Sequence, residues 1–373
     1  MLERSLLSTG NNCRTKRLLE KAANGEEVTI AFIGGSITEG YGTSSEGSYA
    51  YGSYELFRKH YAVNSDAVHI VNAGMCGTPS TIGMIRYERD VSSMAQTKPD
   101  IVFVEFAVND GDDPTDGASY ESLVRTILTE DHAPAVVLVF SVFKNGWNLE
   151  NRLIPIGEAY DLPMISIREA VKPALDEGHI TEDEFFRDEY HPTEYGFQIM
   201  SGCIFNYFET VRAEETAGSD LTLPDTAVIG TQFTNIRMID SSGVTEDVSV
   251  TPGSFTQTDG AMRSYNYDIS RRIFPDNWHK HGTENHPFIL RLHCKNLILI
   301  HKRSAYATFG SAGITVDGKE PVTVDAHFSD AWNNPWCTVL IDEQTAADHM
   351  VSIRMRDDDA DKYFTIFGFG YCQ

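Results

Sequence analysis

Between residues 28 and about 210, short apolar runs alternate with segments of helical length, and this alternation restricts the possible folds most. The runs are rich in β-branched residues, as in strands buried on both faces of a parallel sheet. They are Val28–Ile33, Val68–Val71, Ile101–Phe106, Ala135–Phe140 and Met164–Ile167. Helices are predicted over Tyr49–His60, Ile82–Met94, Tyr120–Leu128, about Asn151–Tyr160 and Tyr195–Val211. The alternation indicates an α/β fold with helices on both faces of a parallel sheet.

A change of composition near residue 213 indicates a second domain. Ala213–Asp220 is small and polar and Pro224 follows it, as in a linker. Beyond it, short β-rich runs separated by turn residues predict an all-β, jelly-roll-like antiparallel sandwich. The runs are Phe288–His293, Leu297–His301, Gly313–Val316, Cys337–Ile341, Met350–Met355 and Tyr363–Gly368, with a hairpin turn at Val316–Lys319. We therefore assign residues 1–215 to an α/β domain and 216–373 to a β-sandwich.

The charge balance argues against two classes of partner. The chain has 30 Lys and Arg against 54 Asp and Glu, a formal charge of −24. Such a surface repels phosphate backbones and anionic lipids, so we expect neither nucleic acid nor membrane as partner. Met1–Gly25 reads as a polar lead-in and a short helix, and no apolar stretch approaches membrane-spanning length. If no leader precedes this chain, we expect a soluble, cytoplasmic protein.

Three patterns that could suggest metals or disulfides have simpler interpretations. The six cysteines are scattered without short repeating spacing, as expected of small buried side chains. Trp278–His281, with His286 beyond, reads as a histidine-rich loop rather than a metal site. Asp357–Asp361 resembles the start of a calcium loop, but Lys362 stands at its glycine position, so a hairpin tip is preferred. No metal or cofactor is expected.

A candidate nucleophile follows the first predicted strand. Gly34, Gly35 and Ser36 come directly after the apolar run, where the loops of an α/β sheet form a ligand-binding crevice. The glycines permit a sharp turn and close approach of a substrate. A tight βα turn without function has the same pattern, so this signal needs partners elsewhere in the chain.

A base and its orienting carboxylate occur near residue 190. Asp188 stands three residues before His191, and in a helical turn or tight loop such residues lie on one side. A serine hydroxyl attacks only when a base such as imidazole removes its proton, and a carboxylate fixes the tautomer of that base. A surface ion pair is the alternative.

Oxyanion donors follow the second and third strands. Asn72–Gly77 could direct a glycine N–H into the crevice, and the Asn109 side-chain amide could be another donor. A turn at Gly77 and a cap or Asx turn at Asn109 are the alternatives. The joint placement of these groups with Ser36 and His191 is the stronger argument for a hydrolytic site.

In these motifs the sequence resembles the SGNH, or GDSL-type, hydrolase family. Gly34–Thr38 corresponds to the family's Gly-Asp-Ser block, Asn72–Gly77 to its glycine block, Val108–Asp110 to its Asn-Asp block and Asp188–His191 to its Asp-x-x-His block. The resemblance covers Ile30 to about Phe208. It implies a flavodoxin-like sheet and ester hydrolysis without metal or cofactor.

The resemblance also implies roles for single residues. Ser36 would be the nucleophile, His191 the base and Asp188 its orienter, and the N–H groups of Ser36 and Gly77 would form the oxyanion hole with the Asn109 amide. Two positions depart from the family pattern. Gly35 replaces the usual aspartate, and Ala107 stands where glycine is common, so the crevice should be slightly tighter.

The leading hypothesis is a serine esterase that removes small acyl groups, most plausibly acetyl, from a carbohydrate, because family members with an attached β-sandwich look like carbohydrate esterases. A lipase-like or lysophospholipase-like acylhydrolase and a non-catalytic glycan-binding protein are the alternatives. Tyr49 could line the substrate entrance or pack its helix. Trp332 and Trp336 could stack on sugar rings from a loop or cover the sandwich core. An oligosaccharide or small-molecule ester is the expected substrate.

Overall fold

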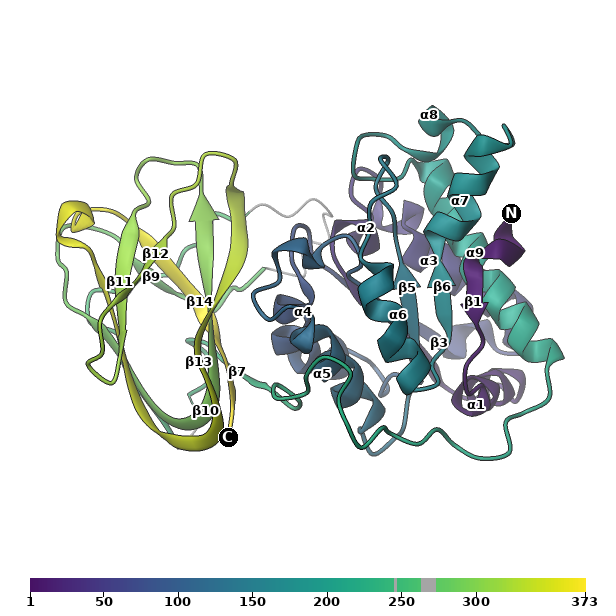
Figure 1. Cartoon of the computed structure of the whole chain (residues 1–373), viewed down its shortest axis with the longest axis horizontal. Coiled ribbons are helices and arrows are strands. Elements are labelled where there is room, and N and C mark those ends of the chain that lie inside the picture. Colours follow the sequence, from purple (N-terminus) through teal and green to yellow (C-terminus); the bar gives the residue numbers. More distant parts are fainter. Residues whose placement is uncertain (245–246, 263–272) are drawn as a thin grey trace. The chain divides into compact units, whose positions relative to one another are not determined.

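The chain divides into two compact units. The computed structural model describes residues 1–244, 247–262 and 273–373. Residues 1–231 belong to the first unit, and the described residues from Gln232 onward form the second. Figure 1 shows an α/β first unit and a second unit made of strands.

A six-stranded sheet forms the centre of the first unit. Its order is β1-β6-β5-β4-β2-β3, with β1 antiparallel to β6 and all other pairs parallel. The five parallel strands therefore have the flavodoxin-like order 2-1-3-4-5, which confirms the predicted fold class. The bounds are β1 Leu6–Ser8, β2 Val28–Gly34, β3 Val68–Gly74, β4 Ile101–Glu105, β5 Ala135–Phe140 and β6 Met164–Ser166.

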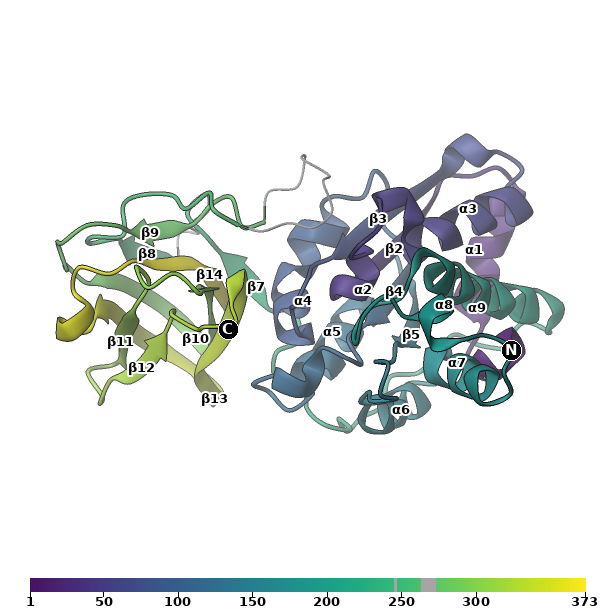
Figure 2. The same cartoon turned by 90° about the horizontal axis from the view of Figure 1, so that it is seen from above.

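Helices cover both faces of this sheet, as Figure 2 shows. One face packs in a single core with α1 Cys13–Ala23, α3 Tyr49–Tyr61, α7 Ile167–Asp176 and α9 Glu194–Ala213. The other face has α4 Ser80–Tyr87, α5 Ala118–Leu128 and α6 Glu150–Ala159. Two helices of a single turn, α2 Ser36–Glu39 and α8 Glu182–Phe185, lie in the loops after β2 and before α9. The predicted helix 82–94 instead continues from α4 into a π-helical turn, Glu88–Ser92.

The start of the chain differs from the prediction. Within the predicted polar lead-in, Leu6–Ser8 pairs with Met164 and Ile165 at the edge of the sheet. Three residues without clear alternation give no period to detect, and their pairing partner lies more than 150 residues away along the chain. The short helix that follows has Leu18 and Leu19 buried, as expected.

Residues 216–231, assigned to the second domain from the sequence, lie against the first unit. The buried carboxylate of Glu121 on α5 accepts hydrogen bonds from the N–H groups of Val228, Ile229 and Gly230, at 2.8, 2.6 and 2.9 Å. Arg14 on α1 pairs with Asp220 at 2.9 Å. Polar, glycine-containing composition predicts the absence of regular structure here, but it does not exclude such anchoring.

The second unit is an antiparallel all-β fold, as predicted. Its eight-stranded sheet has the order β12-β11-β13-β10-β14-β7, with β8 also paired to β10 and β9 to β14. Its inward side chains share one apolar core. The bounds are β7 Arg237–Ile239, β8 Val248–Thr251, β9 Trp278–Lys280, β10 Phe288–Ser304, β11 Ser311–Val316, β12 Val322–Asp325, β13 Trp332–Met355 and β14 Phe364–Cys372.

In the structure, each of two pairs of predicted strands forms one long strand, β10 in the first case and β13 in the second. Phe288–His293 and Leu297–His301 both belong to β10, whose register with β13 shifts between Cys294 and Asn296. Before the shift β10 also pairs with β8, and after it with β14. Bulges of this kind bend a strand without ending it, so one strand serves both parts of the sheet.

Turn predictions in this unit have mixed outcomes. Asp317 and Gly318 both have positive φ, 54° and 70°, and Lys319 N–H donates to Val316 O, as the predicted Asp-Gly hairpin requires. Asp357–Asp359 forms a 3-10 turn between β13 and β14. The predicted hairpin tip is wrong, because β10 lies between these two strands in the sheet and pairs with both of them. The predicted histidine-rich loop is wrong at Trp278–Lys280, because these residues form β9 and are buried.

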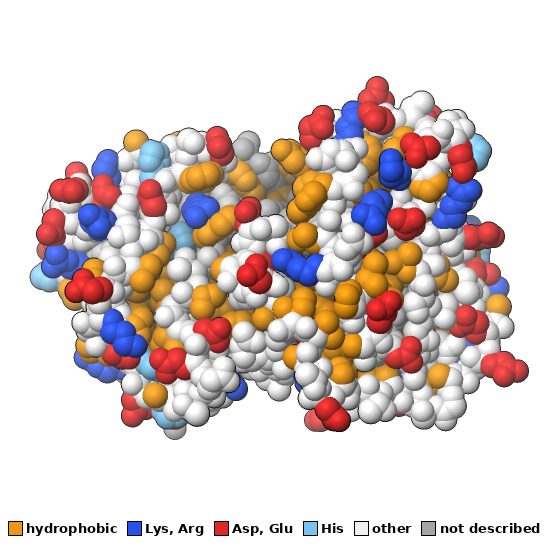
Figure 3. Space-filling model, viewed as in Figure 1, with side chains coloured by type: hydrophobic (Ala, Val, Ile, Leu, Met, Phe, Trp, Pro, Cys, Tyr) orange, Lys and Arg blue, Asp and Glu red, His pale blue; other side chains and the backbone are white. Residues whose placement is uncertain are grey.

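The cysteines, possible metal ligands, helix hydropathy and surface charge can be compared with the predictions from composition. All six cysteines are free, and five of them are buried. Within the described ranges, no group of three or more His, Cys, Asp or Glu side chains is placed to hold a metal ion. No helix in the described part is long and apolar enough to cross a bilayer. Figure 3 shows acidic side chains scattered over the face it draws on both units, rather than gathered into one patch.

The anchoring of residues 216–231 gives a first prediction. Glu121→Ala leaves three backbone N–H groups without their acceptor and removes the 3.1 Å hydrogen bond that the Tyr160 hydroxyl donates to Glu121. We expect a loss of roughly 3 kcal/mol, a fall in melting temperature of about 6–12 °C, and faster proteolysis within 216–231. Calorimetry measures the loss of stability and the fall in melting temperature, and limited proteolysis measures the rate of cleavage within 216–231.

Glu158→Ala is the matched control, because Glu158 is exposed on the neighbouring helix α6. Equal melting temperatures for the Glu121 and Glu158 variants would contradict the proposed anchoring role.

Candidate active site

Ser36 lies at the corner between β2 and α2. Every residue of β2 is buried, and the chain turns at Gly35 so that Ser36 begins the single turn of α2. Its N–H therefore has no acceptor within the helix. Gly40, with φ of 87°, ends the turn in the left-handed conformation. The side chain is half-buried at the carboxyl edge of the sheet, where the sequence predicted it.

Ser36, His191 and Asp188 form one continuous line of hydrogen bonds. His191 Nε2 lies 3.0 Å from Ser36 Oγ. His191 Nδ1 lies 2.9 and 3.1 Å from the two carboxylate oxygens of Asp188. An Nδ1–H that donates to Asp188 leaves Nε2 as the acceptor for the serine proton. The structure thus brings together the three side chains that the sequence placed in two distant segments.

The loop that carries the pair is closed by its own backbone. Asp188 Oδ1 accepts from the N–H groups of Tyr190 and His191, both at 2.8 Å, and Arg187 N–H donates to His191 O at 3.0 Å. Residues three apart therefore face the same side, as the spacing indicated. Because the carboxylate is held by backbone donors, it can orient the imidazole without moving itself.

The surroundings keep His191 neutral near pH 7. Burial lowers the pKa of His191 from its ordinary value, and it outweighs the neighbouring Asp188 charge, which acts in the opposite direction. For Asp188, burial would raise the pKa, but the Tyr190 N–H bond and His191 together hold it below its ordinary value. An ionised carboxylate beside a neutral imidazole is the state a general base requires.

The expected oxyanion donors come from loops that touch α2. A Cβ atom on Gly35 would lie 2.1 Å from Asn109 Oδ1, so the Asn109 amide packs directly against the turn before Ser36. Cys76 N–H donates to Glu39 of α2 at 2.7 Å, and exposed Gly77 follows it with φ of 64°. The structure therefore places all three donor residues around α2.

Two other expectations around the crevice change. Tyr49 does not line a substrate entrance, because it is fully buried, with its hydroxyl 2.8 Å from Thr38 Oγ1 and its ring edge-on to Phe32. Of the two interpretations, helix packing is therefore correct. Ala107 is also fully buried, so its methyl group does not narrow the open crevice.

Trp332 and Trp336 lie in the second unit, in strand β13 rather than in a loop. Both are half-buried. The guanidinium of Arg303 lies 3.7 Å from the centre of the Trp336 ring and covers that face. Asn333, the second residue of β13, has a positive φ, so the backbone is irregular where the strand begins. The sequence predicted a loop for this segment. Stacking of these tryptophans on a sugar stays a prediction.

Tyr41 is a site residue that sequence reasoning missed. Its ring lies 4.1 Å from that of His191, centre to centre, and the Arg187 guanidinium donates to the adjacent Gly42 O. The ring helps to keep water from the imidazole and so contributes to the burial that lowers its pKa. A tyrosine shortly after the nucleophile turn carries no pattern that would indicate this contact.

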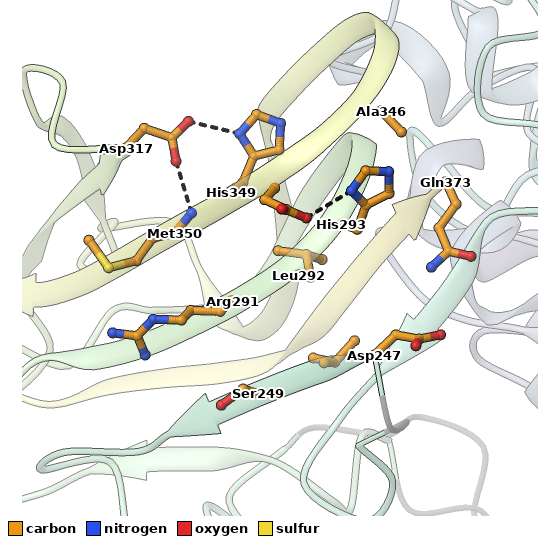
Figure 4. A pocket seen from close by; sticks show the side chains of 12 residues that line it. Asp247, Ser249, Arg291, Leu292, His293, Asp317, Ala346, His349, Met350 and Gln373 are labelled. Atoms are coloured by element: carbon orange, nitrogen blue, oxygen red, sulfur yellow. Dashed lines mark hydrogen bonds and ion pairs between the residues drawn. The ribbon is translucent and has the colours of Figure 1, made fainter.

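A separate pocket of about 820 Å³ lies in the second unit. Figure 4 shows His349 hydrogen-bonded to Asp317 within its wall. In the same wall His293 Nδ1 lies 2.9 Å from Asp348 Oδ1. Among the described residues, His349 Nε2 has no hydrogen-bonding partner, and Glu343 lies 3.8 Å from it. This imidazole thus differs from His191, whose Nε2 is hydrogen-bonded to a serine hydroxyl.

Comparison with known proteins agrees with this geometry. Residues 32–199 match the model of the GDSL-like Lipase/Acylhydrolase family. The first unit is a GDSL-type hydrolase. No curated protein sequence matches the chain significantly. The resemblance inferred from Gly34–Thr38 and the later blocks is thereby confirmed.

The hydrolase also matches solved structures over its whole length. One is a two-domain esterase (CEX) active on acetylated mannans, with TM-score 0.83 and 27% identity over 100% of this chain and 99% of that one. A second structure, of that esterase co-crystallized with mannopentaose, gives TM-score 0.83 and 26% identity over 100% and 98%. The two-unit organisation is therefore shared with an esterase.

The electrostatics of this hydrolase give a second prediction. Only neutral His191 can accept the serine proton, so activity is lost as the pH falls through its pKa, which burial places below the ordinary value of about 6.5. We expect kcat/KM for a small acetate ester to fall to half its plateau below pH 6.5. A midpoint at or above pH 7 would contradict this assignment.

A control separates His191 from a second group that titrates nearby. Burial raises the pKa of Glu105, beneath α2, to about 7. Glu105→Gln should remove any inflection near pH 7 and leave the lower one unchanged.

The close contact at Gly35 gives a third prediction. Gly35→Ala places a methyl group against the Asn109 amide, which must move away from the oxyanion position. We expect kcat/KM to fall roughly a hundredfold, as when one oxyanion donor is removed, with little change in melting temperature. Hydrolysis of p-nitrophenyl acetate measures the rate.

Gly218→Ala is the control, since nothing lies within 4 Å of a Cβ atom at that exposed glycine. Full activity in the Gly35 variant would show that Asn109 needs no fixed position there.

Proposed function

We propose that the protein is a serine esterase that removes acetyl groups from a carbohydrate, with acetylated manno-oligosaccharides as its substrate class. The observation that carries the proposal is the hydrogen-bonded line from Ser36 Oγ through His191 to Asp188, at 3.0 and 2.9 Å. A serine joined to a neutral, oriented imidazole is equipped for acyl transfer.

In the first half of the reaction, Ser36 Oγ attacks the ester carbonyl carbon while His191 Nε2 takes the serine proton. The oxyanion receives hydrogen bonds from the N–H groups of Ser36 and Gly77 and from the Asn109 amide. The tetrahedral intermediate then breaks its bond to the alcohol oxygen, and His191 returns the proton to the departing sugar hydroxyl. An acetyl-serine remains on Ser36.

In the second half, water takes the place of the alcohol. His191 removes a proton from the water, whose oxygen attacks the acetyl carbonyl, and the same donors stabilise the charge. Collapse of this intermediate breaks the bond to Ser36 Oγ, which takes the proton back from His191, and acetate leaves. Throughout, Asp188 stays ionised and stabilises the imidazolium that forms transiently.

The substrate class rests on similarity to one esterase. That protein acts on acetylated mannans, and its likeness to this chain extends over both units at 27% identity. A structure of it with mannopentaose indicates that it binds an oligosaccharide. A neutral, hydroxyl-rich substrate is also compatible with a chain of formal charge −24, which would repel an anionic polymer.

The test compares the wild type with Ser36→Ala on two kinds of substrate. We expect release of acetate from acetylated manno-oligosaccharides and hydrolysis of p-nitrophenyl acetate, with much slower hydrolysis of the octanoate. Ser36→Ala should lower both acetate activities by roughly 10⁴-fold or more, and Ser36→Ala with His191→Ala should lower them no further, because the two residues act as a unit.

Each alternative predicts a different result. A preference for octanoate would favour a lipase-like acylhydrolase. Binding of mannopentaose without turnover of any ester, in the wild type as in Ser36→Ala, would favour a glycan-binding protein. Equal turnover by wild type and Ser36→Ala would remove Ser36 from the mechanism.

A further inference from the structure

An aromatic cluster lies beside His191 and takes no part in the mechanism described above. Phe143 and Trp147, on the loop after β5, stack with their ring centres 5.5 Å apart. Tyr190 meets Phe143 edge-on at 5.1 Å and His191 at 6.2 Å. Phe143 is half-buried, whereas Trp147 is 39% and Tyr190 56% exposed. We call Trp147 and Tyr190, with Phe143 between them, the aromatic platform.

Exposed aromatic rings are rare in the first unit. Among its described residues, the large aromatic side chains classed as exposed are Trp147, Tyr190 and Tyr195. Exposure of a tryptophan leaves apolar area in water that folding would otherwise bury, which makes such a side chain informative. Two of the three therefore gather at one place, next to the base.

The platform is held rigidly. Phe143 N–H donates to Trp147 O at 3.1 Å and Gly146 N–H to Phe143 O at 2.8 Å, which closes the loop into a turn. Trp147 N–H also donates to Asn145 Oδ1 at 2.9 Å. A turn fixed by its own hydrogen bonds holds the ring in one position before a ligand arrives. Little binding free energy is therefore spent on ordering the loop when a ligand stacks on the ring.

The same loop is tied to both halves of the candidate active site. Lys144 N–H donates to Glu189 O, between Asp188 and His191, at 3.1 Å. Leu149 N–H donates to Ala107 O at 2.9 Å, two residues before Asn109. A Cβ atom on Gly111 would lie 3.2 Å from the tip of the Trp147 ring. Trp147 therefore borders the oxyanion loop on one side, and Tyr190 borders the base on the other.

We propose that the platform is a sugar-binding subsite, on which a neutral pyranose ring of the acetylated oligosaccharide stacks while its ester is held at Ser36. This inference rests on the proposed function and names residues that bind its substrate. The axial C–H groups of a pyranose form a flat apolar face that fits an exposed indole or phenol ring. Open rings suit such one-sided stacking, whereas a long acyl chain needs an enclosed apolar channel.

Charges near the platform are compatible with a neutral ligand. The Lys144 ammonium lies 3.4 Å from Glu182 and 3.8 Å from Asp183, so its charge is shared with two carboxylates. The exposed carboxylate of Glu189 stands beside Tyr190 in the chain. The carboxylates provide acceptors for sugar hydroxyl groups, and the exposed Arg187 guanidinium, which donates to Gly42 O, adds a donor in the same loop.

The test uses Trp147→Ala and Trp147→Phe and compares two acetate esters. Acetylated manno-oligosaccharide carries the sugar, and ethyl acetate lacks it and also lacks the aromatic leaving group of p-nitrophenyl esters, which could itself stack on Trp147. We expect Trp147→Ala to lower kcat/KM on the oligosaccharide roughly tenfold relative to ethyl acetate, mainly by raising KM. Trp147→Phe should restore most of this loss.

Tyr195→Ala is the matched control, since Tyr195 is 48% exposed and lies outside the platform. We expect it to behave as the wild type on both esters. Tyr190→Ala should resemble Trp147→Ala, and an unchanged pH midpoint in that variant would show that His191 is undisturbed.

Four outcomes would overturn the proposal. An equal loss on both esters would assign the loop a role in positioning the catalytic groups, and no loss on either would place sugar binding elsewhere. A loss confined to p-nitrophenyl octanoate would assign the platform to the acyl chain. A wild type that hydrolyses ethyl acetate but not the acetylated sugar would instead refute the carbohydrate part of the proposed function, and with it the subsite.

Discussion

The close approach of α2 to the ends of β2 and β3 is the constraint on which the candidate active site depends. Gly34 and Gly74 are register partners at the ends of these strands. A Cβ atom on Gly34 would lie 2.2 Å from Thr38 Oγ1 of α2 and 2.5 Å from Glu105 O, and one on Gly74 would lie 2.0 Å from Glu39 N of α2. Because Glu105 O and Glu39 N are backbone atoms, rotation of a side chain does not relieve these contacts. Larger residues would lift α2 and move Ser36 away from His191.

Buried polar groups hold this arrangement from below, at a cost in stability. Glu105 lies under α2 and accepts from Thr38 Oγ1 at 3.0 Å, while Asp110 accepts from Ser80 N–H at 2.7 Å. Burial raises the pKa of Glu105 to about 7 and that of Asp110 to about 8. Because folding raises both pKa values, the stability that these carboxyls contribute is complete below their unfolded pKa, near 4, and is lost as the pH rises through 7 and 8. The site is thus held by groups whose protonation near neutral pH matters to the fold.

The sequence predicted what depends on local pattern and missed what depends on distant contacts. Five apolar runs identified β2 to β6, and the three-residue spacing of Asp188 and His191 correctly placed them on one side of a loop. The edge strand β1 escaped detection, because its only signal is its pairing with β6. In the second unit, the sequence predicted two strands in place of each of β10 and β13. A bulge interrupts the alternation of inward and outward side chains in the same way as a turn does, so the two cannot be told apart by pattern.

The same division explains which site residues could be found. Ser36, His191 and Asn109 carry polar chemistry at the ends of predicted strands or in a short motif, so their positions follow from topology. Tyr41 and Tyr49 are both tyrosines shortly after the nucleophile turn, yet one covers His191 and the other lies in the core with its hydroxyl on Thr38. That difference depends on the path of the chain after Gly40, which bends with positive φ at Gly40 and Gly42. Glycine marks the bend in the sequence, but the direction in which the next side chain points is fixed only by what it packs against.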